Sequence, residues 1–210
     1  MGMEHVNELY EAAVFGGEKG AVAEANLELY AVEADVALAR GKVLHAGYLA
    51  NRQANPKQAE LLERALTLYQ ALGDVRGEAE ALFWLGTWHQ VVREAYEEAV
   101  PCFQRSYELA ESVGDKLTLS YATRHLAFAA EAEGRMEEAQ ERFEESVRLR
   151  EELGFLPGLA AALLALGEFR RQRLGDREGA LRLMDKARST AQKCGAHGVL
   201  EWIGNARAQL

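Results

Sequence analysis

The sequences ALGD at residues 71–74 and SVGD at residues 112–115 decide the fold, because a glycine returns in them at nearly constant spacing. Gly154 and Gly195 continue the series, and successive glycines stand 41, 40 and 41 residues apart. Self-similarity at such a period is typical of a stacked repeat protein. Each unit of such an array buries its apolar face only against its neighbours, and the stack presents a long surface. The pattern therefore favours a binding module over an enzyme.

Helix-forming residues dominate the chain, and the period-two alternation of β-strands is nearly absent. Apolar residues recur at helical spacing, for example at Leu62, Ala65, Leu66 and Tyr69. An all-α chain is therefore predicted. The expected helices cover residues 3–15, 20–39, 42–54, 57–72, 76–92, 96–113, 117–133, 136–153, 157–173, 177–194 and 197–209.

The recurring glycine marks the turn between units, because glycine takes the left-handed conformation that ends a helix without steric cost. Asp74 and Asp115 follow directly and are expected to cap the next helix by accepting hydrogen bonds from its free amides. Pro101 falls inside the helix predicted from residue 96, and should kink that helix or displace its start.

Small and bulky side chains also recur with the repeat. The second helix of each unit places a bulky apolar residue between two small ones, and the first helix supplies a further small residue. The bulky residues are Leu62, Phe103, Phe143 and Met184. The small residues before them on the second helix are Ala99, Ala139 and Ala180, and those after them are Ala65, Ser106, Ser146 and Ala187. The small residues on the first helices are Gly86, Ala127 and Gly167. Gly47 is the expected counterpart in the first unit, where Gln58 replaces the first small residue. Small side chains let helix backbones approach closely while the bulky residue fills the space between.

This arrangement resembles the tetratricopeptide repeat (TPR), with its Leu-Gly in the first helix and its Ala, aromatic and Ala positions in the second. Residues 85–106 match best, and residues 126–146 and 166–187 follow with small departures. The family period is about 34 residues, whereas the longer period here resembles the subtype found in kinesin light chains and in many bacterial regulators. The resemblance implies a right-handed α-solenoid of antiparallel helix pairs. Its expected parts are an N-terminal helical cap (1–41), four units (42–73, 74–114, 115–154 and 155–195) and a C-terminal capping helix (196–210).

The resemblance also implies a concave groove lined by the first helix of each unit, with mixed chemistry suited to a peptide. The residues expected to bind are Tyr48, Asn51, Arg52, Phe83, Thr87, Gln90, Tyr121, Arg124, Phe128, Glu131, Leu164, Glu168 and Arg171. The three arginines are suited to hold a carboxylate by paired hydrogen bonds. In the alternative interpretation they are solvated, or pair with Glu131 and Glu168.

Enzymatic motifs are missing from the sequence. It has no His-Glu-x-x-His string, no Gly-x-Ser-x-Gly elbow and no phosphate-binding glycine loop. His45, His89 and His125 fall on successive first helices, but His89 is out of register with the other two. We expect no catalytic residue, no metal site and no cofactor.

The amino-acid composition argues against nucleic acid and membranes as partners. The formal net charge is -9, and Lys and Arg are interspersed with Asp and Glu, so clustered positive charge for nucleic acid is missing. No apolar run approaches the ~20 residues of a membrane span, and residues 1–5 (MGMEH) do not start a signal peptide. With only Cys102 and Cys194, a disulfide framework is not expected, and a cytoplasmic location fits.

Two functions remain open. The first is a non-catalytic module that binds a protein or peptide segment in the groove. The alternative is a self-associating scaffold or ligand-sensing regulator, which forms a homodimer through its apolar terminal helices.

Overall fold

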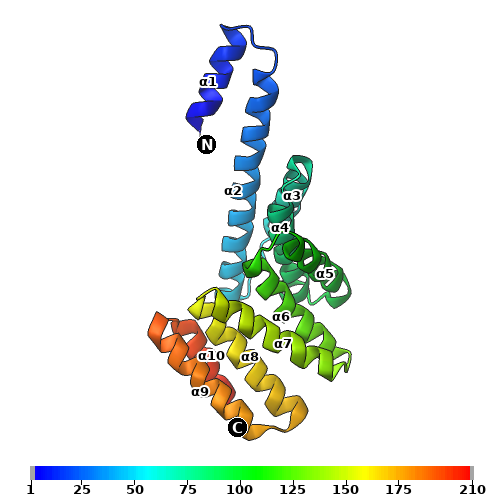
Figure 1. The fold of residues 1–210 in the computed structure, drawn as a ribbon, viewed down its shortest axis with the longest axis vertical. Coiled ribbons are helices and arrows are strands. Elements are labelled where there is room, and N and C mark those ends of the chain that lie inside the picture. The colour runs from blue at the N-terminus through cyan, green and yellow to red at the C-terminus, as the bar shows by residue number, and fades with distance from the viewer. Residues whose placement is uncertain (1–2, 209–210) are drawn as a thin grey trace. The chain divides into compact units, whose positions relative to one another are not determined.

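The computed structural model describes residues 3–208, and within this range every regular element is a helix. The predicted all-α fold of packed helix pairs is confirmed. The helices are α1 (Met3–Val14), α2 (Ala21–Asn51), α3 (Lys57–Leu72), α4 (Val75–Thr87), η1 (Trp88–Val92), α5 (Tyr96–Ser112), α6 (Lys116–Ala132), α7 (Met136–Glu152), α8 (Leu156–Leu174), α9 (Arg177–Cys194) and α10 (His197–Arg207) (Figure 1). The chain divides into an N-terminal unit, residues 1–109, and a C-terminal unit, residues 110–210, which are described separately.

The recurring glycines end helices as predicted. Gly73 and Gly114 have φ angles of 68° and 67°, the left-handed conformation that follows the last helical turn. The Asp74 carboxylate accepts a hydrogen bond from the Gly77 amide, and the Asp115 carboxylate accepts one from the Leu117 amide. The turn signal in the sequence is therefore a paired device, in which a glycine stops one helix and an aspartate starts the next.

In the N-terminal unit, α2 is one continuous helix of 31 residues, along which α1 runs back (Figure 1). The expected break between residues 39 and 42 is wrong, because Gly41 is used for close packing and not for a turn. A Cβ atom at Gly41 would lie 2.6 Å from Cδ2 of Leu62 on α3, so only glycine admits that side chain. Gly47, expected in this role, has no atom within 4 Å of its Cβ position, and that assignment is also wrong.

The same contact recurs in later helix pairs. A Cβ atom at Gly86 on α4 would lie 2.8 Å from Cε1 of Phe103 on α5. A Cβ atom at Gly167 on α8 would lie 3.4 Å from Cγ of Met184 on α9. Both bulky side chains are fully buried. A large side chain thus presses onto a glycine in the pairs α2–α3 and α4–α5, whereas Met184 meets Gly167 at ordinary van der Waals distance.

Two serines at the small positions add a polar contact to this packing. The Ser106 hydroxyl on α5 donates to the carbonyl oxygen of Ala79 on α4, at 2.7 Å. The Ser146 hydroxyl on α7 donates to the carbonyl oxygen of Ser120 on α6, at 2.8 Å. Serine therefore does more at these positions than replace alanine, because it ties the second helix of a pair to the backbone of the first.

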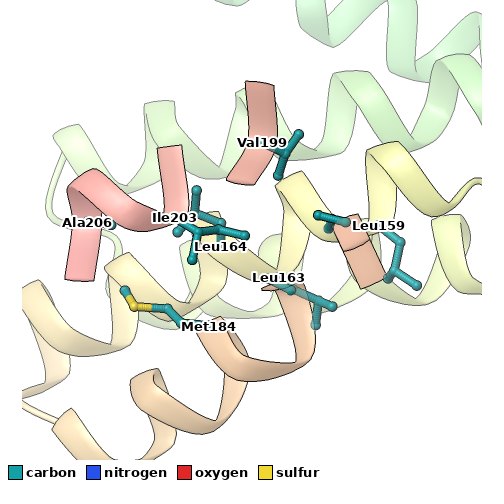
Figure 2. Packing of buried hydrophobic residues seen from close by; sticks show 10 residues of the cluster. Leu159, Leu163, Leu164, Met184, Val199, Ile203 and Ala206 are labelled. Carbon is teal, nitrogen blue, oxygen red and sulfur yellow. The ribbon is translucent and has the colours of Figure 1, made fainter. Parts of the chain in front are cut away.

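A core in the C-terminal unit joins the last three helices. Side chains from α8, α9 and α10 meet in it, as Figure 2 shows. Ile203 and Val199 of α10 pack there with Leu163 of α8 and Met184 of α9. Helix α10 therefore buries apolar side chains of α8 and α9 that would otherwise be exposed in this unit.

The predicted helix 76–92 is divided in the structure. The α-helical ladder of α4 ends at Thr87, and Trp88–Val92 form a π-helical turn, η1. Glu94 then takes a positive φ of 55° before α5 begins. Pro101 lies inside α5, and the start of that helix at Tyr96 is not displaced. Short π-helical turns such as η1 are frequent at functional sites.

Gln58 departs from the repeat pattern and lowers the stability of the folded chain. Its side chain is fully buried on α3, and neither its amide nitrogen nor its amide oxygen has a hydrogen-bond partner. Burying an unpaired amide is unfavourable, while a thioether of similar size needs no partner.

We therefore predict that Gln58→Met raises the free energy of unfolding by about 1–2 kcal/mol. Urea denaturation of the two proteins measures the difference, and Gln140→Met, at a partly exposed position on α7, serves as the matched control. A variant less stable than the parent would show that the buried amide is satisfied.

Candidate functional site

The candidate residues of the N-terminal unit fall into two groups. Tyr48, Asn51 and Arg52 lie at the end of α2, where the Arg52 guanidinium stands 5.6 Å from the centre of the Tyr48 ring. Phe83 and Thr87 are buried in α4, with exposed fractions of 2% and 4%. The Thr87 hydroxyl donates to the Phe83 carbonyl oxygen, so this second group serves packing and leaves little surface for a ligand.

Gln90 lies in η1, next to the aromatic side chains of Trp88 and His89. Its neighbour His89 packs edge-on against Trp88, and the Arg93 guanidinium lies 5.4 Å from the centre of the Trp88 ring. Burial lowers the pKa of His89, and its Nδ1 has no hydrogen-bond partner. The π-helical turn therefore presents a small aromatic and cationic surface.

Arg150 is the functional candidate that the sequence analysis missed. It comes from α7 and is fully buried, with its guanidinium 4.8 Å from the centre of the Tyr121 ring. The guanidinium donates to the carbonyl oxygen of Gly158 at 2.8 Å and to the hydroxyl of Ser120 at 3.3 Å. A signal existed in the sequence, since residue 150 continues the buried face that carries Phe143 and Ser146.

Arg124 lies one turn along α6 from Tyr121 and close to this buried cation. Burial of its guanidinium lowers the pKa of Arg124, and its Nε has no hydrogen-bond partner. Burial, together with the nearby charge of Arg124, lowers the pKa of Arg150 to about 9. Among residues 3–208, neither arginine forms an ion pair with a carboxylate. The C-terminal unit thus holds two neighbouring cations without a counter-charge.

Acidic and basic groups of α6 and α8 lie near each other in the same unit. Glu131 is paired with Arg173 at 2.6 Å, and not with any of the three candidate arginines. Burial raises the pKa of Glu168, the charge of Arg171 opposes that rise, and the charge of Glu131 adds to it. Arg171 forms no ion pair with any described residue, and its Nε lacks a partner.

The apolar candidates of this unit differ in exposure. Phe128 is 37% exposed, and its ring packs edge-on against Phe143 with centroids 5.0 Å apart. Leu164 is buried in the core between α8, α9 and α10. Phe128 therefore offers an exposed apolar surface beside the charged groups, whereas Leu164 packs in the core and is not available to a ligand.

Metal ligands do not converge in the part of the chain that the structure describes, where His, Cys, Asp and Glu nowhere gather in threes suited to an ion. His45 is buried beside Trp84, their ring centroids 5.6 Å apart, and burial lowers its pKa. None of the helices formed by residues 3–208 is both long and apolar enough to cross a lipid bilayer.

Comparison with known proteins agrees with this architecture. Residues 79–152 match the family described as Tetratricopeptide repeat, so this part of the chain carries TPR-type repeats. The crystal structure of aspartyl phosphate phosphatase F from Bacillus subtilis is similar over 98% of this chain and 52% of its own length, with a TM-score of 0.68 and 15% sequence identity. At that identity the likeness shows the fold alone, and the chain spans about half the length of that protein. No curated protein matched the chain in sequence.

The raised pKa of Glu168 has a consequence for stability. The folded state holds this proton more tightly than the unfolded state, so stability falls as the pH rises through the folded-state pKa. Glu168→Gln replaces the carboxyl group with an uncharged amide, so the folded state no longer loses stability as this group ionises. We predict that it raises the Tm by a few degrees or less at about pH 7.5, and that the difference vanishes toward about pH 4.

Thermal unfolding followed by circular dichroism across this pH range measures the effect. Glu137→Gln, at an exposed position on α7, is the matched control and should leave the Tm unchanged. A Glu168→Gln protein that is less stable than the parent at pH 7.5 would show that attraction to Arg171 outweighs the burial of the carboxylate.

Proposed function

We propose that the chain is a non-catalytic module that binds a protein or peptide segment, and that Tyr121, Arg124 and Phe128 of α6 with Glu168 and Arg171 of α8 form its contact surface. The observation that carries the proposal is the half-buried side chain of Arg124, whose buried Nε has no hydrogen-bond partner, beside the buried guanidinium of Arg150. A buried cation without a counter-charge is costly to keep. A ligand carboxylate would offset that cost and gain charge-assisted hydrogen bonds.

The surroundings of Arg124 favour a peptide over a simple anion. Phe128 offers an apolar surface, and the Tyr121 ring lies 4.8 Å from the guanidinium of Arg150. Glu168 and Arg171 add one group of each charge. Such a mixture of aromatic and charged groups is typical of surfaces that recognise protein segments.

The helical repeats at residues 79–152 support a binding role, since repeat arrays present extended surfaces. Function does not follow from the fold, and no phosphatase activity is carried over from the structural neighbour. The half-buried free thiols of Cys102 and Cys194 support a location in the cytoplasm. A ligand-sensing regulator is the alternative, and it would use the same surface.

A displayed library of random peptides with free carboxyl termini tests the proposal. We predict that the chain selects peptides rich in carboxylates, and that Arg124→Gln weakens their binding by about 10–100-fold, the effect of losing one charge-assisted hydrogen bond. Fluorescence anisotropy of the selected peptides measures Kd, and amidated copies show whether the terminal carboxylate is the one recognised.

Arg177→Gln, at an exposed position on α9, is the matched control and should bind as the parent does. Circular dichroism and the Tm establish that both variants are folded. Selection of no peptide, or equal binding by the Arg124→Gln protein, would overturn the proposal.

A further inference from the structure

Helix α2 is apolar on two opposite faces. One face packs against α3 and α4 through Ala34, Leu38, Gly41 and His45, all of them buried. On the opposite face lies a row of apolar side chains that we call the α2 stripe. The stripe consists of Val22, Ala25, Leu29, Val32, Val36, Ala39, Val43, Ala46 and Ala50.

The α2 stripe follows a strict heptad. Its residues alternate at steps of three and four along four heptads, about 42 Å of helix. Such a period, sustained over this length, is the pattern of a helix that packs against another helix in a coiled coil. Yet Val36 is 51% exposed and Val43 is 70% exposed. Helix α1 packs along the first part of α2, where Ala25 of the stripe is partly buried. At Val36 and Val43, in contrast, the described part of the chain leaves the apolar face exposed.

We propose that a second copy of this chain covers the α2 stripe, with the two α2 helices antiparallel. The charges of α2 support this occupant. Glu24, Glu28, Glu33 and Asp35 lie in its first half, followed in its second half by the cations Arg40 and Lys42. A parallel pair would place Asp35 beside the partner's Arg40 but Glu28 beside the partner's Glu33, a contact of like charges. An antiparallel pair can place both Glu33 and Asp35 beside cations of the partner.

One register satisfies both the stripe and the charges. When Val36 lies opposite the partner's Ala39, Val32 meets the partner's Val43. In this register Glu33 flanks the partner's Arg40. Asp35 likewise flanks the partner's Lys42. The two-fold axis repeats each contact, which gives four complementary charge pairs in one self-complementary interface.

Two of these flank groups already have a partner in the single chain. Lys42 donates to Glu80 at 2.6 Å and Asp35 accepts from the Tyr69 hydroxyl at 2.8 Å, and each keeps hydrogen-bonding capacity for a second contact.

Arg40 is exposed and forms no ion pair with any described residue. Glu33 is paired with Arg64 at 2.8 Å in a contact that is about half exposed, so its carboxylate can accept a further bond from the partner. A hollow of about 730 Å³ between α2 and α3 borders the stripe beside Arg40 and Val43 and gives the flank of a second helix room.

This inference is independent of the proposed function, because it rests on α2 alone and not on α6 or α8. Sedimentation equilibrium at about 1–100 µM tests it. The parent should be a dimer, and Val36→Asp and Val43→Asp should each weaken dimerisation by at least about tenfold, because they bury a carboxylate in the contact. Both positions are exposed in the single chain, so the variants should keep the circular dichroism spectrum of the parent.

Leu27→Asp is the matched control. Leu27 is 54% exposed on the same helix, at a heptad position that faces away from the stripe, and this variant should dimerise as the parent does. A parent that is monomeric at 100 µM would overturn the proposal and leave the stripe to a helix of another protein. Dimers that persist in both valine variants would overturn it as well.

A second measurement tests the orientation. Val32→Cys and Val43→Cys are purified separately and oxidised mildly, alone and mixed. An antiparallel pair in the register above predicts a disulfide-linked dimer that forms at least about tenfold faster in the mixture than in either sample alone. The parent, which carries the native Cys102 and Cys194, sets the background. Equal linking of each variant with itself would contradict the antiparallel arrangement.

Discussion

The fold depends on one contact, in which a bulky apolar side chain of one helix presses onto a small residue of the helix before it. Leu62 meets Gly41, Phe103 meets Gly86, and Met184 approaches Gly167. Because a Cβ atom at the first two glycines would overlap the facing side chain, the distance between the paired helices is fixed by the absence of that atom. The positions of the functional groups on α4, α6 and α8 follow from this spacing.

The turns between repeats could be predicted from sequence because their signals are local. A glycine that must adopt a positive φ and an aspartate that caps the next helix stand side by side, as at Gly73 and Asp74. The role of Gly41 was not predictable in this way. Gly41 and Gly47 lie in one helix, and only the position of Leu62, which comes from tertiary packing, distinguishes them.

The candidate site was predictable as a set of positions but not in its electrostatics. The sequence predicted a helix around Arg124, and α6 contains it, but the pairing of Glu131 with Arg173 is a property of the packed helices. Arg150 was missed because a charged residue in the last turn of a helix is most often solvated. Its burial beneath α6 makes the neighbourhood of Arg124 cationic and links the packing of α7 to the chemistry proposed for α6.

A double-mutant cycle on Gly86 and Phe103 tests most directly whether the contact of large on small side chain sets the helix spacing. Gly86→Ala, Phe103→Val and the double variant are unfolded in urea, and their free energies of unfolding are compared with that of the parent. Since Phe103→Val removes the ring atoms that a Cβ at Gly86 would strike, the account predicts that the double variant is more stable than the sum of the single losses by at least about 1 kcal/mol. Losses that add to within about 0.3–0.5 kcal/mol would contradict it.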